Sequence, residues 1–428
     1  MGSVKDSKVQ IDLIEQADRI GGRVYALPFR GSKYEAGGSI LHSSNQYAGS
    51  LSHQFGLLHR ADDDIGSHLM GIFDGEDFVF KESSYSLVTM FRIIQRYGMD
   101  ALRMQSLVNS MLHHFSRIYV YQKKGTAFKE LKQMLAAMSY KFPDLLHHSF
   151  YENLRNMSFS DVTINELVQA ISMVNYGQPV RGLHAFVGAV SSAGADFSGS
   201  LWSIDGGNER LPQELAKRSG ARLFLMTQVL EVELLPNGTY IVRDANANEM
   251  SHDAIVIAHP LSLSGIQFRG FTDGDMEIIS AEKKMGKYHR TVASFVSGVR
   301  STNYTSGDLE DVIVCKDNFF FQSISRLSPA SSRMQPTDHP VAPDVYKIFS
   351  PNPLTPQQLA TLFDKIQDVH VIPWDAYPQY YQIQAQNPKF ELRKGLYYIN
   401  AIEWAASAME MSLISAKNAA LLTNQFLS

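Results

Sequence analysis

The stretch Val9-Gln10-Ile11-Asp12-Leu13-Ile14-Glu15, followed by the glycine doublets Gly21-Gly22 and Gly37-Gly38, decides the fold of this chain. Its apolar residues alternate with polar ones, and this period of two predicts a β-strand. The strand ends on Glu15, whose ionised carboxylate only accepts hydrogen bonds and therefore suits the donor hydroxyls of a ribose. The stretch is typical of the second strand of a dinucleotide-binding βαβ unit. The alternative interpretation is an edge strand that ends in a solvated glutamate.

The two doublets extend this interpretation. Arg19 and Arg23 flank the first doublet, while the second follows Glu35 and precedes Ser39. Glycine allows the backbone to approach a diphosphate closely, and arginine forks can pair with its oxygens. The pattern Glu-x5-Gly-Gly-Arg-x11-Glu-Ala-Gly-Gly-Ser resembles flavin amine-oxidase-like folds. It predicts an α/β fold with a Rossmann-type sheet that binds FAD.

One part of such a sheet is missing from the sequence. In a complete unit, a G-x-G-x-x-G turn between the first strand and the first helix precedes the acidic residue. Only Met1 to Lys8 precede the predicted strand. We therefore expect an N-terminally incomplete sheet with exposed strand edges, and the sequence leaves open whether FAD binds.

Composition excludes several classes of protein. The 428 residues carry a formal net charge of −4, and the basic residues form no runs, which argues against a nucleic-acid partner. Cys315 is the only cysteine, so an internal disulfide and a paired thiol site for a metal are excluded. No apolar stretch reaches membrane-spanning length, and no secretory signal is visible. The triplets that begin at Asn156, Asn237 and Asn303 would permit glycosylation in a lumenal protein.

Further segments have recognisable periodicity. Apolar residues three and four apart predict helix from Ser86 to Tyr121. We interpret the stripe of Met104, Leu107, Val108, Met111, Phe115 and Ile118 as core, with the lining of a substrate channel as the alternative. Strands are expected between 222 and 258, with a turn at 236–238, and the apolar run 254–258 is expected in a parallel sheet covered on both faces. A strand at 396–399, a turn at 400–404 and a helix over 405–426 close the chain. The positive end of this helix would favour charge on a flavin, although simple docking of an amphipathic helix explains the pattern equally well. Residues 328–343 are typical of a surface loop.

Several longer stretches resemble the prenylcysteine oxidase family, also called prenylcysteine lyase, and its prenylcysteine-oxidase-like relatives. The resemblance extends from about Val9 to the C-terminus. The stretches that carry it are Tyr34-Glu35-Ala36-Gly37-Gly38-Ser39, Arg117-Ile118-Tyr119-x-Tyr121-Gln122, Val174-Asn175-Tyr176-Gly177-Gln178, Ala185-Phe186-x-Gly188-Ala189, Leu201-Trp202-Ser203-x-Asp205-Gly206-Gly207-Asn208 and Ala401-Ile402-Glu403-Trp404-Ala405-Ala406-Ser407-Ala408-Met409-Glu410.

The resemblance implies an FAD-dependent thioether oxidase that cleaves farnesyl- or geranylgeranyl-cysteine with O2 and water to a prenyl aldehyde, cysteine and hydrogen peroxide. It implies a lysosomal or secretory glycoprotein, although the chain shows no signal sequence. It also implies an FAD-binding domain of residues 9–85, 200–260 and 395–428, and a substrate domain of residues 86–199 and 261–394. Peripheral membrane contact is compatible with an amphiphilic substrate, but the sequence nominates no membrane-binding helix.

The resemblance also implies the cofactor contacts. Glu15 would bind the ribose, the backbone of Val229 would meet adenine, and Glu403 and Met409 would lie near the ribityl chain and the ring. Gly21, Gly22 and Arg23 would lie on the diphosphate side, and Gly37, Gly38 and Ser39 beside the ring. The catalytic residues are unknown, because for His42, Tyr176 and Trp202 structural packing is favoured over catalysis. No metal ligands are expected.

Two other functions stay open. The chain could be a non-catalytic relative that binds prenyl lipid or protein partners without tight FAD. It could also be a flavin amine oxidase, in which Trp404, Tyr397 and Tyr398 would imitate an aromatic cage.

Overall fold

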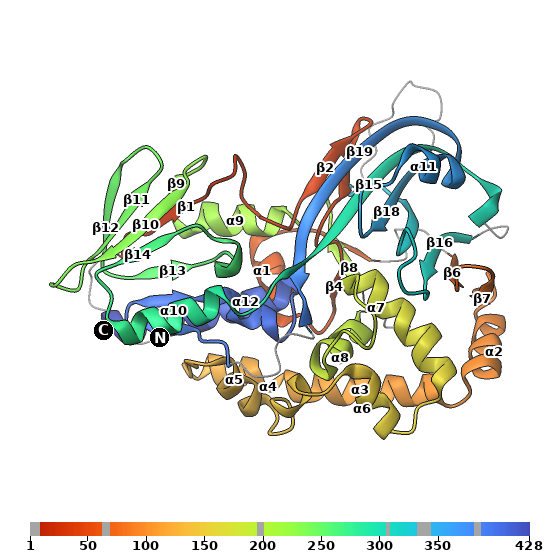
Figure 1. Cartoon of the computed structure of the whole chain (residues 1–428), viewed down its shortest axis with the longest axis horizontal. Coiled ribbons are helices and arrows are strands. Elements are labelled where there is room, and N and C mark those ends of the chain that lie inside the picture. The colour runs from red at the N-terminus through yellow and green to blue at the C-terminus, as the bar shows by residue number, and fades with distance from the viewer. Residues whose placement is uncertain (1–8, 62–68, 195–200, 305–308, 332–343, 381–386) are drawn as a thin grey trace.

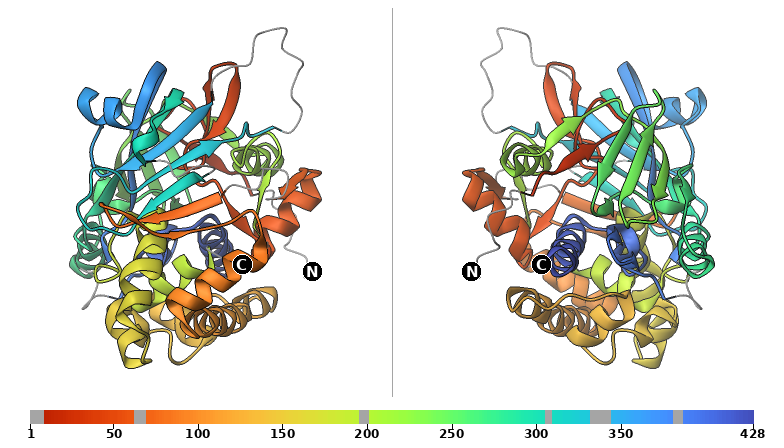
Figure 2. Two further views of the ribbon diagram at one scale, coloured as in Figure 1. Left: turned by 90° about the vertical axis from the view of Figure 1, so that its right-hand side faces the viewer. Right: turned by 90° about the vertical axis from the view of Figure 1, so that its left-hand side faces the viewer.

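The computed structural model describes residues 9–61, 69–194, 201–304, 309–331, 344–380 and 387–428, except for the side chains of Ala61 and Asn303. Figure 1 shows small sheets at one end of the molecule, a larger sheet with two long strands at the other, and a layer of helices below. Figure 2 shows that this helical layer, orange to yellow, lies on one side of the larger sheet.

The sheet expected around Glu15 consists of two separate parts. β1 (Asp12–Ile14) pairs in parallel with β9 (Arg222–Phe224), and β13 (Ile255–Ile257) pairs in parallel with β21 (Leu396–Tyr398), which also pairs with β20 (Glu391–Arg393). Within the described ranges, β1 pairs with no strand other than β9, and β13 with none other than β21. One backbone edge of each strand is therefore unpaired.

The predicted β-rich section forms mostly as expected. A four-stranded sheet has the order β12 (Glu249–His252), β11 (Tyr240–Asp244), β10 (Val229–Leu234) and β14 (Gln267–Arg269). The predicted turn joins β10 to β11, and Gly238 N donates to Leu235 O at 2.9 Å. The apolar run 254–258 contains β13 in a parallel pair, but 44% of Val256 is exposed. The expectation that this strand is covered on both faces was therefore wrong, because no described element fully covers the face to which Val256 belongs.

The larger sheet has seven strands in the order β19-β15-β18-β17-β16-β6-β7. Their bounds are β6 (Leu69–Phe73), β7 (Phe78–Lys81), β15 (Tyr288–Arg300), β16 (Leu309–Val314), β17 (Ser323–Leu327), β18 (Val345–Ser350) and β19 (Phe363–Pro378). β6 and β7 belong to this sheet although the predicted domain boundary at residue 85 assigns them to the FAD-binding domain. The division into domains stays a prediction.

The predicted helical region is present with two breaks, after Tyr97 and at Ser116. The three helices of this region are α2 (Ser86–Tyr97), α3 (Asp100–Phe115) and α4 (Arg117–Lys123). The helical layer continues with α5 (Leu131–Met138), α6 (Phe150–Asn156), α7 (Gln169–Tyr176) and α8 (Ala185–Ala193). Met104, Val108, Met111 and Ile118 of the predicted stripe are buried. This burial confirms the core interpretation of the stripe.

The remaining elements connect these layers. The hairpin of β2 (Ala26–Phe29) and β3 (Ser32–Glu35) packs through Leu27, Phe29 and Tyr34 against Ala293 and Phe295 of β15. The other bounds are α1 (Gln46–Phe55), α9 (Arg210–Ser219), α10 (Asp273–Lys283), α11 (Pro356–Leu362) and the three-stranded sheet of β4 (Leu41–His42), β8 (Leu201–Ile204) and β5 (His59–Ala61). Most of the predicted loop at 328–343 lies outside the described residues.

The last helix, α12 (Met409–Leu427), begins four residues later than the predicted start at Ala405. A 3₁₀ turn spans Ile399–Trp404, and Ala408 is extended, with φ −157° and ψ 159°. Tertiary hydrogen bonds hold this segment outside the helix: Tyr176 Oη donates to Ser407 O at 3.1 Å, and Ser407 N donates to Tyr380 Oη at 3.0 Å. Packing thus overrides the helix propensity of the alanines.

Candidate active site

The two glycine doublets lie against each other. Gly38 N donates to Arg23 O at 3.0 Å, and a Cβ on Gly37 would lie only 1.8 Å from that carbonyl oxygen. Gly21 and Gly22 have φ angles of +115° and +54°, which favour glycine. The doublets therefore form one compact turn structure, and at least Gly37 is required by the chain's own packing.

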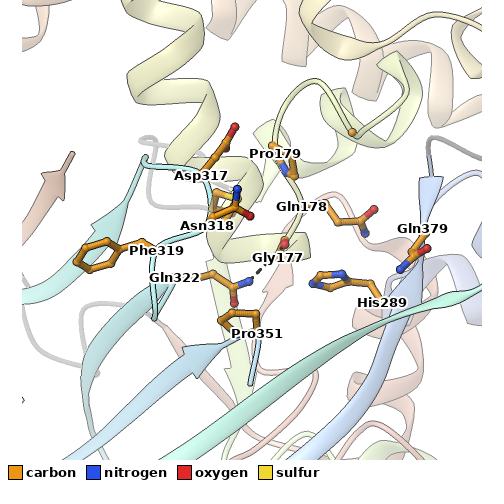
Figure 3. Close-up of a pocket in the computed structure, with 12 residues that line it drawn as sticks. Gly177, Gln178, Pro179, His289, Asp317, Asn318, Phe319, Gln322, Pro351 and Gln379 are labelled. Atoms are coloured by element: carbon orange, nitrogen blue, oxygen red, sulfur yellow. Dashed lines mark hydrogen bonds between the residues drawn. The ribbon is translucent and has the colours of Figure 1, made fainter. Parts of the chain in front are cut away.

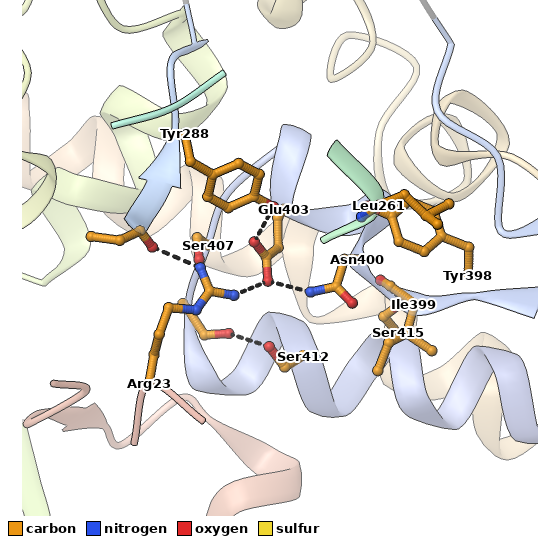
Figure 4. Close-up of polar contacts among 12 residues, drawn as sticks. Arg23, Leu261, Tyr288, Tyr398, Ile399, Asn400, Glu403, Ser407, Ser412 and Ser415 are labelled. Carbon is orange, nitrogen blue, oxygen red and sulfur yellow. Dashed lines mark hydrogen bonds and ion pairs between the residues drawn. The ribbon is translucent and has the colours of Figure 1, made fainter. Parts of the chain in front are cut away.

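Arg23 joins this turn to the end of the chain (Figure 4). Its guanidinium donates to the carboxylate of Glu403 and, at 2.7 Å, to Ala376 O of β19. The second oxygen of Glu403 accepts from Tyr288 Oη at 2.7 Å, and Asn400 Nδ2 donates to the first at 2.7 Å. The side chain of Glu403 is almost fully buried, at 2% exposure, and all of these hydrogen bonds are made with other groups of the protein.

Electrostatics holds this network in its charged form. Burial opposes the charge on Arg23, but the Glu403 carboxylate raises the pKa of Arg23 above its ordinary value. Burial and the same carboxylate raise the pKa of Tyr288, so the phenol stays protonated and donates. Arg23 and Glu403 neutralise each other, a role that the motif did not reveal. Their contacts with the diphosphate and the ribityl chain stay predictions.

Met409 lies beside the second doublet. A Cβ on Gly38 would lie 3.3 Å from Met409 Cγ and 3.4 Å from its Sδ, so the structure brings these two predicted residues together. Met409 is the first residue of α12, and no side chain caps this end of the helix. Its first amides and the positive end of the helix dipole therefore suit an electron-rich ligand group.

Glu15 lies at a separate position, at the end of β1. Its amide donates to Phe224 O at 2.9 Å, and its Oε1 accepts from Ala17 N at 2.8 Å. Thr227 N, two residues before Val229, donates to Glu15 O at 2.9 Å, so the two predicted adenosine contacts lie near each other. Burial lowers the pKa of His259, and the Glu15 carboxylate acts in the opposite direction.

His42 and Trp202 occupy neighbouring strands. β4 pairs with β8, and the Trp202 ring stacks on His59 with centroids 3.9 Å apart. His42 Nδ1 accepts from Ser44 N at 3.0 Å. These contacts are those of packing residues, and nothing in them indicates catalysis.

Tyr176 belongs to a buried aromatic cluster. Its ring meets Tyr377 and Tyr380 edge-on, with centroids 4.9 and 5.5 Å apart. Burial raises the pKa of all three phenols, so they remain neutral. The cluster adjoins the segment before α12 through the bond from Tyr176 to Ser407. Tyr377 and Tyr380 lie outside every motif, so sequence reasoning had no signal for them.

A cavity of about 310 Å³ lies next to this cluster (Figure 3). Gly177, Gln178, His289, Gln322 and Gln379 are among the residues that line it. His289 Nε2 and Gln322 Oε1 are buried and have no hydrogen-bond partner among the described residues. Burial lowers the pKa of His289, which therefore remains a neutral imidazole. A smaller void that also touches Tyr377 shares Gly177 and Gln322 with the cavity.

The three residues of the proposed aromatic cage are core residues. Trp404, Tyr397 and Tyr398 are each 1% exposed and belong to the largest hydrophobic cluster. Tyr397 Oη donates to Leu422 O at 3.2 Å, and Tyr398 Oη accepts from Leu261 N at 3.2 Å. These rings therefore pack in the core, and their role beside a flavin stays a prediction.

No group of three or more His, Cys, Asp or Glu side chains could hold a metal ion in the part of the chain that the structure describes. None of the helices described is long and apolar enough to cross a membrane.

Known proteins that are similar to this chain belong to the family that its sequence resembles. The family model described as prenylcysteine lyase matches residues 80–428. Prenylcysteine oxidase 1 of Rattus norvegicus is 33% identical over 434 residues, which cover 97% of this chain and 83% of that protein. Prenylcysteine oxidase 1-like of Bos taurus is 32% identical over 432 residues, with 97% of this chain and 85% of that protein covered.

Solved structures show the fold. Cyclohexylamine oxidase from Brevibacterium oxydans has a TM-score of 0.61 at 13% identity, covering 97% of this chain and 93% of its own. Putrescine oxidase bound to putrescine has a TM-score of 0.59 at 12% identity, covering 98% and 94%. The predicted α/β fold of the flavin amine-oxidase type is thereby confirmed.

Proposed function

Because this chain belongs to the prenylcysteine lyase family, we propose that it is an FAD-dependent thioether oxidase that cleaves S-prenyl-L-cysteine. With O2 and water, the reaction would yield a prenyl aldehyde, cysteine and hydrogen peroxide. The observation that carries this proposal is the match of 33% identity over 97% of the chain to proteins named prenylcysteine oxidase 1. Farnesyl and geranylgeranyl chains are the proposed substrates.

Residues of this chain fit flavin adenine dinucleotide at both its adenosine end and its flavin end. Glu15 offers a half-buried carboxylate to a ribose, and Val229 lies close by at the start of β10. At the other end, Gly38 and the uncapped first turn of α12 offer close backbone approach and a positive dipole. FAD, when bound, supplies a two-electron acceptor for a hydride from the carbon beside sulfur.

The chain's own residues would bind and orient the substrate. The edge-packed tyrosines 176, 377 and 380 would give an aromatic wall that excludes water from the reacting carbon. His289 Nε2, in the tautomer with its proton on Nδ1, and Gln322 Oε1 are two acceptors without partners. An ammonium group carries three donors, so we propose that the cavity receives the amino group of the cysteine.

Absorbance and peroxide assays test this proposal. Purified protein should show flavin absorbance bands and release peroxide with farnesylcysteine but not with a simple amine. Colourless protein that still binds farnesylcysteine would support the non-catalytic alternative, and peroxide from the amine alone would support an amine oxidase. Either result would contradict the proposal.

The cellular location belongs to this proposal as well. By family, we propose a lysosomal or secretory glycoprotein. Asn156 at the end of α6 and Asn237 in the β10–β11 turn are exposed, which glycosylation requires. Endoglycosidase treatment of the protein from its own cells should increase its electrophoretic mobility, and unchanged mobility would contradict the glycosylation.

A further inference from the structure

The helix α2 presents an apolar face to solvent. Leu87, Met90, Phe91 and Ile94 follow the spacing i, i+3, i+4, i+7 and are 84%, 50%, 66% and 45% exposed. Because these four side chains are exposed, they do not belong to the core. The helix is instead held by Ile93 and Tyr97, which pack in a separate cluster with Phe80. α2 therefore has one apolar face for the protein and a second that no described element covers.

The exposed face continues into the next helix. Met99 and Leu102, at the corner between α2 and α3, are 65% and 51% exposed, and Tyr85 before α2 is 73% exposed. Figure 1 places α2 at the rim of the helical layer, at the end of the molecule opposite the chain's C-terminus. Single exposed apolar residues are ordinary in soluble proteins, but a contiguous group on one helix marks an interaction surface.

The charge of the surrounding segment indicates the partner. Residues 83–129 contain seven Lys and Arg residues and one acid, Asp100, in a chain whose total charge is −4. Asp100 is buried and accepts from Arg103 Nη1 at 2.8 Å and from Ser160 N at 2.8 Å. Helices α2, α3 and α4 therefore expose no carboxylate of their own. Arg96 of α2 is paired with Glu166, whereas Arg92 of α2 has no carboxylate partner among the described residues. Lys123 and Lys124 lie exposed at the other end of this segment, at the end of α4 (Figure 1).

We propose that the α2 face, defined as Leu87, Met90, Phe91 and Ile94, inserts shallowly into an anionic lipid surface. An apolar stripe on a helix within a cationic segment is the pattern that binds at the boundary between headgroups and acyl chains. The cations add attraction to acidic lipids within a Debye length. The inference rests on exposure and charge, and it stands whether or not the proposed oxidase activity is correct.

Vesicle flotation tests this inference with the full chain. The protein should float with vesicles of phosphatidylcholine and phosphatidylserine, and less with phosphatidylcholine alone. The double variant Leu87→Glu/Phe91→Glu should lose at least tenfold in vesicle affinity, because two carboxylates replace the inserted groups. Leu427→Glu is the matched control, since Leu427 is a 44% exposed leucine on the helix α12 far from α2, and it should float like the parent protein.

A second variant tests the inference even if the double variant does not fold. Phe91→Trp keeps the apolar face, and its fluorescence should be quenched by brominated lipid more than that of the parent protein, whose tryptophans are 202, 374 and 404. Failure of the parent protein to float with acidic vesicles would overturn the inference. Association into dimers that Leu87→Glu/Phe91→Glu abolishes, without vesicle binding, would assign the face to a second copy and would also overturn it.

Discussion

Arg23 and Glu403 stand 380 positions apart in the chain and satisfy each other's charge at the site. At the scale of single residues, such pairs decide which substitutions the site tolerates. The Arg23→Met variant should lose about 3 kcal/mol of unfolding free energy, because it leaves a buried carboxylate without its cation. Glu403→Gln added to that variant should recover part of the loss, since an amide costs less to bury. Urea unfolding of the two single variants and the double variant measures this coupling, and strict additivity would show that the pair does not interact.

Glu282 on α10 gives the protein a pH dependence. Burial raises the pKa of Glu282 from 4.5 to about 8, and its Oε2 has no hydrogen-bond partner among the described residues. The folded state therefore holds a proton that the unfolded state releases, and stability falls as pH rises from about 4.5 to about 8. Glu282→Gln should be more stable than the parent protein at the upper end of this range, by roughly 2–4 kcal/mol, and similar to it at the lower end.

Thermal unfolding across this pH range measures the effect. Glu277→Gln is the matched control, because Glu277 lies on the same helix but is exposed, and it should leave the pH dependence unchanged. A parent-like slope for Glu282→Gln would show that Glu282 does not cause the dependence.

At the scale of elements, the contact between the two glycine turns sets the geometry of the site. A Cβ at Gly37 would collide with the backbone of Arg23, whereas a Cβ at Gly38 would meet only the flexible thioether of Met409. We expect Gly37→Ala to cost roughly 3 kcal/mol or more, and Gly38→Ala to cost about 1 kcal/mol or less. Denaturant unfolding of the two variants tests this ranking, and an equal cost would contradict the packing described.

Flavin content of the Gly38→Ala variant separates packing from cofactor binding. If Gly38 lies beside the flavin ring, the variant should be folded yet retain less flavin than the parent protein. Full retention would remove Gly38 from the proposed contacts.

At the scale of the whole molecule, the split of the dinucleotide sheet should divide the chain into regions of unequal stability. β1 and β9 form a two-stranded ribbon in which Leu223 is 45% exposed, whereas β15 lies between β18 and β19 with eight consecutive buried residues from Thr291 to Gly298. A two-stranded ribbon is marginal by itself, so its amides should exchange faster than those of β15 by at least tenfold. Hydrogen exchange read by mass spectrometry measures this, and equal protection would show that the ribbon is as stable as the larger sheet.

Local patterns predicted those parts of the fold that depend on near neighbours in the chain. The apolar stripe of α3 and α4 and the turn at 236–238 formed where the sequence placed them, because each is governed by a period or a turn residue. The alternation before Glu15 also predicted a strand, although only Asp12–Ile14 of the predicted Val9–Glu15 forms one. The glycine doublets and the longer stretches identified the family and therefore the fold type. They also located Gly38 and Met409, which the structure brings into contact.

The features that predictions missed depend on partners far away in the chain. The start of α12 is delayed by tyrosines 176 and 380, which lie on other elements. The pairing of Arg23 with Glu403, the aromatic wall and the cavity with His289 and Gln322 arise where separate layers meet. The sequence by itself determined the family, the fold type and the local elements, since periodicity and motifs act over short range. Only the tertiary structure decided which polar groups are satisfied and which apolar face stays exposed, because burial depends on every layer at once.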